Sequence, residues 1–236
     1  MSFHVFTNIG NNRENNEDSF LILEPENNHH ILAVADGMGG HNAGEVASSI
    51  AIDSIKDYTF NFNENILGQI KSVITKANKN IFDHSKKNDQ LKDMGTTLTL
   101  GIIINNKLYF GHVGDSRIYL YDEILKQITT DHSLVNDLVK NKSIEPDEAF
   151  DHPQKNIITQ ALGVDKDLEI QSNSLDIKNN DIIMLCTDGL TDMIRFKNIE
   201  KVFQEYDNEK EIVEILGEKA LHNGGKDNIT IIMGRI

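Results

Sequence analysis

Two apolar runs of this chain each end in an Asp-Gly pair, which is typical of a buried strand that carries a carboxylate at its tip. One lies in residues 33–40 (AVADGMGG), with its carboxylate at Asp36, and the other in residues 185–192 (LCTDGLTD), with Asp188. A third carboxylate, Asp227, stands just before another apolar run. Carboxylates at strand ends, without a histidine or cysteine cluster beside them, form the oxygen-rich ligand set that a hard divalent cation prefers.

Each of these signals also has an ordinary structural explanation. Asp-Gly is a common turn before a helix, and Asp227-Asn228 could simply be the turn into the last strand. Three such coincidences at the edges of core strands favour a metal cluster over three unrelated turns. The glycines that follow Asp36 remove side chains, so that the backbone can approach a bound ion or phosphate.

The composition limits the kinds of protein this chain can be. With 236 residues, 39% of them hydrophobic, it has enough apolar side chains for one large domain, which we place at residues 1–236. Its formal net charge of −14 argues against nucleic acid or an anionic membrane as the main partner. The single cysteine permits no internal disulfide, and no apolar stretch is long enough to span a membrane. We therefore expect a cytoplasmic monomer, without a signal peptide.

Hydrophobic periodicity predicts strands near both ends and in the middle of the chain, with helices between them. The predicted helices are residues 42–55, 66–82, 196–206 and 209–222. The predicted strands are residues 3–9, 19–23, 31–35, 96–104, 107–113, 117–121, 126–129, 181–187 and 228–236. Asn105-Asn106 and Gly114-Asp115 are candidate tight turns between neighbouring strands. This pattern indicates an α+β protein in which helices flank the sheets.

A polar loop, residues 10–18, joins the first two strands and has a composition that usually means a solvated loop. Arg13 in this loop is nevertheless suited to a phosphate, because its planar guanidinium can bond two oxygens at once. Glu17 and Asp18 could hold water on metal ions.

The order of these motifs resembles the metal-dependent protein serine/threonine phosphatases of the 2C type. The resemblance covers residues 10–232 and is closest to the compact bacterial members, which carry Met where the animal enzymes have His, here Met38. The motifs that carry it are Arg13-x-x-Asn16-Glu17-Asp18, Asp36-Gly37-Met38-Gly39-Gly40, Gly95-Thr96-Thr97, Val113-Gly114-Asp115-Ser116-Arg117, Thr187-Asp188-Gly189-Leu190 and Asp227-Asn228. Each motif alone is weak, but six in the family's order are specific.

The resemblance implies a four-layer α-β-β-α sandwich, with two antiparallel sheets flanked by helices, around a centre of two Mn²⁺ or Mg²⁺ ions. The roles that it implies are a bridging carboxylate from Asp36, a carbonyl ligand from Gly37, further carboxylate ligands from Asp188 and Asp227, ligands through water from Glu17 and Asp18, and a contact from Arg13 to the substrate phosphate. It also implies a third, weaker ion at Asp115 and Asp192. Residues 131–163 match the family's mobile flap subdomain, where substrate choice is expected to be set.

The implied reaction is hydrolysis of phosphoserine and phosphothreonine in proteins by a metal-bridging hydroxide, whose formation the two ions favour by lowering the pKa of water. The expected partners are phosphoproteins involved in signalling. A cognate serine/threonine kinase would phosphorylate them, and this chain would remove the phosphate. Met38 cannot protonate the leaving group, so a metal-bound water or another group must do so.

Two other functions remain open. One is a hydrolase of small phosphate esters, and the other is a catalytically inactive module that binds phosphoproteins on the same fold. The inactive module is expected to lack a core acid, whereas Asp36, Asp188 and Asp227 are all present. A cysteine phosphatase is disfavoured, because Cys186 lies inside an apolar run with no arginine closer downstream than Arg195.

Overall fold

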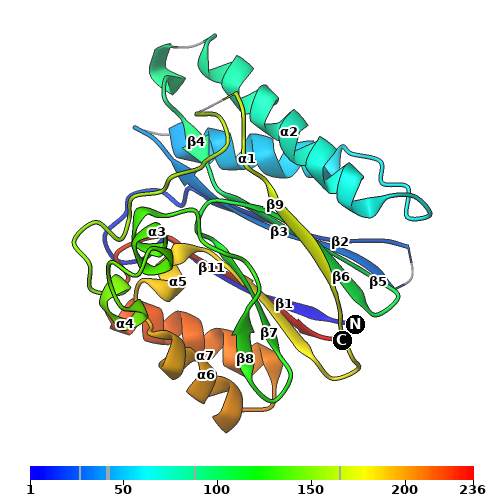
Figure 1. Ribbon diagram of the computed structural model, residues 1–236, viewed down its shortest axis with the longest axis vertical. Helices are drawn as coiled ribbons and strands as arrows, with labels where there is room; N and C mark the ends of the chain where they lie inside the picture. Colours follow the sequence, from blue (N-terminus) through cyan, green and yellow to red (C-terminus); the bar gives the residue numbers. More distant parts are fainter. Residues whose placement is uncertain (27, 41–42, 88, 165) are drawn as a thin grey trace.

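Two antiparallel sheets lie face to face in the computed structural model, which describes residues 1–26, 28–40, 43–87, 89–164 and 166–236 (Figure 1). Helices cover the outer face of each sheet. This arrangement confirms the expected four-layer α+β sandwich.

The first sheet has its outer face covered by α6 (Phe196–Glu205) and α7 (Glu209–His222). Its strands, in spatial order, are β1 (Phe3–Asn8), β11 (Ile229–Arg235), β10 (Ile182–Cys186), β7 (Arg117–Tyr121) and β8 (Leu125–Gln127). Both helices begin and end close to the predicted boundaries. Their buried residues, such as Val202 and Leu216, recur at helical spacing and pack on the apolar face of this sheet.

The second sheet has its outer face covered by α1 (Ala43–Lys56) and α2 (Ile66–Ser85). Its strands, in spatial order, are β2 (Asp18–Glu26), β3 (His29–Met38), β5 (Leu98–Ile104), β6 (Lys107–Val113) and β9 (Gln171–Asp176), and β4 (Gly95–Thr96) pairs with the end of β3. Residue 42, the expected start of the first helix, lies outside the described residues.

Strand β3 shows why these strands read as continuous apolar runs. Ala33 and Ala35 face the helices, whereas Leu32 and Val34 face the opposite sheet. Because both faces of the strand are covered, both sets of alternating side chains are apolar. The small alanines also let α1 lie close to the strand that carries Asp36.

One predicted turn is wrong. Asn105-Asn106 forms the expected hairpin, with positive φ angles of 48° and 59°. Gly114-Asp115, by contrast, does not join paired strands, since β6 pairs with β5 and β9 in one sheet whereas β7 pairs with β8 and β10 in the other. This segment carries the chain from one sheet to the other, with Gly114 at a φ of 109°.

Strand β9 was not predicted. Its sequence, QSNSLD, lacks apolar alternation, and it pairs with β6 at the edge of the sheet. An edge strand can stay polar because part of it faces solvent.

The remaining short elements are η1 (Asp89–Leu91), α3 (Leu134–Lys140), α4 (Pro146–Ala149) and α5 (Asp188–Thr191). Of these, α3 and α4 belong to the irregular residues 131–163, called the flap segment below. Among the described helices, none combines the length and apolar character that crossing a bilayer requires.

Candidate active site

The predicted carboxylates meet where the ends of strands from both sheets converge. Asp36 lies near the end of β3, and Asp18 pairs with it directly across the strands. Asp188 begins α5 just after β10, and Asp227 precedes β11, the neighbour of β10. The charge of Asp36 interacts with Asp188, Asp18, Asp115 and Asp227, so the fold brings together residues that are far apart in the sequence.

The surrounding protein disfavours the charged form of these acids. Burial, followed by repulsion between the carboxylates, raises the pKa of Asp36 and of Asp188 well above the usual range. Burial also raises the pKa of Asp18 and of Asp115 to about 7. Asp18, Asp36 and Asp188 keep part of their surface accessible, as a site open to substrate must. Positive charge placed among these carboxylates would therefore be strongly favourable.

Unpartnered oxygens show that these acids fit a cation. In the described part of the chain, the Oδ1 atoms of Asp18, Asp115 and Asp188 are buried without a hydrogen-bond partner. A buried carboxylate oxygen without a partner is costly, and such an atom calls for an ion or water beside it. An all-oxygen donor set of this kind suits Mg²⁺ or Mn²⁺.

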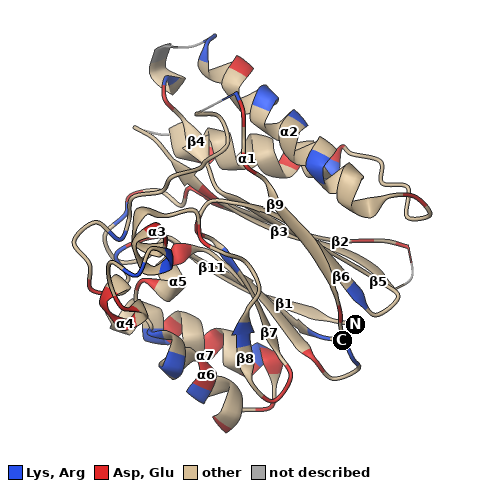
Figure 2. Cartoon of the chain, in the orientation of Figure 1, with Lys and Arg blue, Asp and Glu red and all other residues tan. Residues whose placement is uncertain are grey.

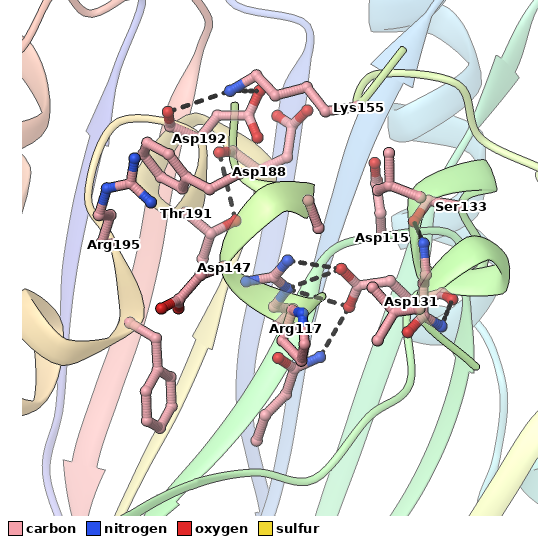
Figure 3. A pocket seen from close by; sticks show the side chains of 18 of the residues that line it. Asp115, Arg117, Asp131, Ser133, Asp147, Lys155, Asp188, Thr191, Asp192 and Arg195 are labelled. Carbon is pink, nitrogen blue, oxygen red and sulfur yellow. Dashed lines mark hydrogen bonds and ion pairs between the residues drawn. The ribbon is translucent and has the colours of Figure 1, made fainter. Parts of the chain in front are cut away.

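Two basic side chains currently hold two of the predicted ligands. The guanidinium of Arg13 donates to Asp227 Oδ2 at 2.6 Å. In the second pair, which Figure 3 shows, Lys155 Nζ lies 3.0 Å from Asp192 Oδ2. Within the described ranges, no three His, Cys, Asp or Glu side chains close around one point as a formed ion site requires. These ion pairs turn Asp227 and Asp192 toward cations of the protein itself.

The predicted third-ion residues are neighbours in space. Asp115 lies in the crossover between β6 and β7 and is 7% exposed, and Asp192 caps the C-terminal end of α5. The charge of Asp188 interacts with both of them. Asp115 is thus next to the main cluster, although Gly114-Asp115 is not the hairpin that its sequence predicted.

Glu17 and Gly37 are held mainly through their backbones. The carbonyl of Glu17 accepts hydrogen bonds from the Ser48 hydroxyl at 2.6 Å and from the Gly37 N–H at 3.2 Å. A Cβ on Gly37 would collide with the carbonyl oxygen of Gly44, so glycine lets α1 approach β3 at this point. The side chain of Asp18 is fixed differently, because its Oδ2 accepts a hydrogen bond from the Thr187 hydroxyl at 2.9 Å.

Asn228 organises the Arg13 loop, a role that sequence reasoning did not assign. Its side-chain amide donates to the carbonyls of Ile9 at 2.8 Å and Asn15 at 3.0 Å, and its Oδ1 accepts the Glu17 N–H at 2.8 Å. The same motif thus supplies the acid Asp227 and the amide that ties down the loop. In the sequence, only the position of Asn228 directly after Asp227 indicated that this residue could matter to the site.

Threonine hydroxyls hold the backbone of Asp36, and these were also missed. The Asp36 N–H donates to Thr97 Oγ1 at 2.9 Å, and Thr96 Oγ1 donates to the Asp36 carbonyl at 2.8 Å. Thr97 Oγ1 in turn shares a 2.8 Å hydrogen bond with the Ser116 hydroxyl, next to Asp115. The Gly95-Thr96-Thr97 motif was visible in the sequence, but a strand threonine by itself indicates no particular partner.

Comparisons with known proteins identify the family of this chain. The family model described as protein phosphatase 2C matches residues 9–221. The serine/threonine phosphatase stp of Listeria monocytogenes serotype 4b is 37% identical over 233 residues, covering 96% of this chain and 92% of that protein.

Among solved structures, serine/threonine phosphatases also match this chain. Serine/threonine phosphatase Stp1 from Staphylococcus aureus matches with a TM-score of 0.93 at 34% identity, covering 99% of this chain and 94% of that one. The catalytic domain of the serine/threonine protein phosphatase PstP, in complex with two manganese ions, matches with a TM-score of 0.85 at 33% identity, covering 98% of this chain and 96% of that one. With a family model over most of its length and bacterial relatives over nearly all of it, the chain belongs to the protein phosphatase 2C family of metal-dependent serine/threonine phosphatases.

Proposed function

We propose that this chain hydrolyses phosphoserine and phosphothreonine in proteins, using two Mn²⁺ or Mg²⁺ ions held in the cluster around Asp36. The observation that carries the proposal is the convergence of carboxylates around Asp36 in a member of a metal-dependent family. Asp18, Asp115 and Asp188 each have one buried oxygen without a partner among the described residues. The manganese-bound PstP structure supports the choice of metal.

The carboxylates of Asp36, Asp188 and Asp227 and the carbonyl of Gly37 would hold the ions, with Asp36 as the central ligand. Glu17 and Asp18 act through water. When bound, the ions would activate water for attack on phosphorus and offset the charge of the phosphate. The hydroxyls of Thr96 and Thr97 fix the backbone of Asp36 at the end of β3.

Arg13 takes the substrate phosphate in this proposal. Its side chain is 46% exposed and reaches the cluster from the loop side, so the guanidinium can turn from Asp227 toward a phosphate. Phosphate and guanidinium match in charge and in fork geometry. Met38 has no proton to give, so the leaving group takes its proton from water or another group.

A third, weaker ion is proposed between Asp115 and Asp192. The unpartnered Oδ1 of Asp115 supports it, and the Lys155–Asp192 pair competes with it. Occupation of this site therefore requires Lys155 to release Asp192, which gives a reason for weak binding.

The biological setting is proposed from the same observations. The substrates are phosphoproteins made by a cognate serine/threonine kinase, and the protein works in signalling as a cytoplasmic monomer. Its single domain spans residues 1–236, with the flap segment as a subdomain beside the site. The net charge of −14 supports proteins rather than nucleic acid as partners.

The test measures phosphate release from phosphoserine and phosphothreonine peptides and from small phosphate esters. Turnover should need Mn²⁺ or Mg²⁺, fall to background in excess chelator and favour the peptides. Asp36→Asn and Asp188→Asn should each remove most activity but leave a folded protein, as judged by circular dichroism. Asp53→Asn, which changes an exposed acid on α1, is the matched control and should keep wild-type turnover. Full activity in chelator would contradict the two-metal mechanism, and a preference for small esters would favour the alternative function.

A further inference from the structure

The loop that carries Arg13 is hydrogen-bonded to the C-terminal end of α7, a helix far from it in the sequence. The backbone N–H of Asn11 donates to the carbonyl of Gly225 at 2.7 Å. The side-chain amide of Asn11 donates to the carbonyls of Leu221 at 2.8 Å and Gly224 at 3.0 Å. One residue therefore makes three hydrogen bonds to the turn between α7 and β11, and sequence reasoning assigned it no role.

The end of α7 can accept these bonds because the last carbonyls of a helix have no partner within it. The N–H groups of Gly224 and Gly225 fold back onto the helix and close its last turn. The Leu221 carbonyl can still accept from Asn11, since each carbonyl has two lone pairs. Although α7 carries acidic and basic residues along its length (Figure 2), the group that meets its last carbonyls is a neutral amide. Asn11 thus satisfies the helix end without adding a charge beside Arg13.

The loop and the turn touch through their backbones, so neither can shift far without the other. A Cβ on Gly10, whose φ is 80°, would lie 2.2 Å from the carbonyl oxygen of Asp227. Only glycine permits this approach in this conformation. The turn is also held on its other side, because the side-chain amide of Asn223 donates to the Met193 carbonyl at 2.9 Å. The turn therefore gives the loop a firm support.

This contact lies directly beside two groups of the candidate active site. Arg13 follows Asn11 by two positions, and Asp227 follows Gly225 by two positions. The Arg13 guanidinium donates to Asp227 Oδ2 at 2.6 Å. Asn228 ties the ends of the loop together, as described above, whereas Asn11 holds the part of the loop that leads into Arg13. The place of the guanidinium relative to Asp227 thus depends on the Asn11 contacts.

We propose that Asn11 is a positioning residue of the phosphatase reaction, which sets the place of the Arg13 guanidinium by holding the loop on the end of α7. The inference rests on the proposed function, in which Arg13 takes the substrate phosphate and Asp227 holds an ion. When Arg13 turns from Asp227 to a phosphate, its ion pair no longer fixes the loop. The contacts of Asn11 and Asn228 then keep the loop backbone in place. A small displacement of a group that holds the substrate lowers the reaction rate strongly, so loss of the Asn11 contacts should reduce turnover.

The experiment measures kcat/KM on a phosphothreonine peptide with Mn²⁺, for Asn11→Ala in the wild-type and in the Arg13→Ala background. In the wild-type background, Asn11→Ala should lower kcat/KM by roughly five- to tenfold. In the Arg13→Ala background, the same substitution should lower it by less than about twofold, because the group that Asn11 positions is gone. Asn12→Ala is the matched control. Asn12 is an exposed neighbour whose side chain has no hydrogen-bond partner among the described residues, so its substitution should leave turnover unchanged in both backgrounds.

Hydrogen exchange of the metal-free protein provides a second measurement, which does not depend on catalysis. Asn11→Ala should speed exchange in residues 10–16 and leave β10 and β11 protected, whereas Asn12→Ala should change neither. A fold that is destabilised as a whole would instead exchange faster in those strands.

Three results would overturn the inference. One is an unchanged kcat/KM in Asn11→Ala, and another is unchanged exchange in the loop. The third is an equal loss of kcat/KM in both backgrounds, which would mean that Asn11 acts through the fold or through Asp227 rather than through Arg13. Mn²⁺-dependent hydrolysis of the peptide by the wild-type protein would leave the phosphatase function standing in each of these cases.

Discussion

Acidification from about pH 7 to about pH 5 should destabilise the fold by about 2 kcal/mol through one side chain, His112. This residue of β6 is fully buried, and its Nδ1 shares a 2.8 Å hydrogen bond with the Thr99 hydroxyl. Its Nε2 is buried without a partner among the described residues. A proton added to the ring would place a positive charge inside the core.

The magnitude follows from the environment of the ring. Burial, and then the neighbouring His132 ring 5.1 Å away, lower the pKa of His112 to about 3, while the carbonyls of Gly114 and Thr130 oppose the shift less strongly. In the unfolded chain the pKa returns to about 6.5. Below pH 6.5 His112 is protonated in the unfolded chain but stays neutral in the folded chain. The contribution of the neutral ring to the free energy of unfolding is therefore complete above pH 6.5 and is lost as the pH falls toward 3. At about 1.4 kcal/mol per pH unit, the loss at pH 5 is about 2 kcal/mol.

The assay compares urea unfolding of the wild type and His112→Asn at both pH values, in chelator. Asn does not titrate but can still bond the Thr99 hydroxyl. Carboxylates with a raised pKa, such as Asp18, act in the opposite direction and stabilise the fold on acidification, so only the difference between the two proteins is diagnostic. The wild type should lose about 2 kcal/mol more than the variant. Equal pH dependence of the two proteins, or an NMR titration of His112 with its midpoint near 6.5, would refute the reasoning.

Further predictions concern the polar contacts around the cluster. Arg13→Ala should lower kcat/KM by about ten- to a hundredfold, since it removes one charge-assisted contact to phosphate. The affinity for Mn²⁺ measured by calorimetry should not fall, because the substitution frees the Asp227 carboxylate from its ion pair. A drop in that affinity would make Arg13 structural. Lys155→Met should strengthen binding of an additional Mn²⁺ ion, detected by anomalous diffraction near Asp192, and absence of any ion there would argue against the third site. Thr97→Val should lower the free energy of unfolding in urea by roughly 2–4 kcal/mol, because it leaves the Asp36 N–H and the Ser116 hydroxyl without this partner. Thr97→Ser keeps the hydroxyl and should recover most of that loss. Equal stability of the two variants would assign the loss to packing instead.

Most of the regular structure could be predicted from the sequence, because hydrophobic periodicity is a local property that survives in any context. The apolar runs at β3 and β10 and the spaced apolar residues of α6 and α7 were correctly identified. Strand β9 was missed because its polar residues depend on pairing with β6 rather than on burial of their own.

The acids of the candidate site could also be predicted, since Asp36, Asp188 and Asp227 each stand at the edge of an apolar run. Asn228 and Thr97 could not be assigned roles, because a side-chain amide or hydroxyl has no defined function until its partner is known. Their partners lie on other strands and loops, which only the folded chain brings within hydrogen-bonding distance.

By itself, then, the sequence determined which segments are strands and helices, which carboxylates stand at strand ends, and that the centre would be rich in oxygen ligands. The tertiary structure decided that Gly114-Asp115 crosses between sheets, that Lys155 holds Asp192, and that the Arg13 loop is held on the end of α7. The physical reason is the distance along the chain over which each kind of interaction acts. Periodicity and turn chemistry act over a few residues, whereas contacts such as Arg13–Asp227, between residues 214 positions apart, exist only because two sheets stack with their strand ends together.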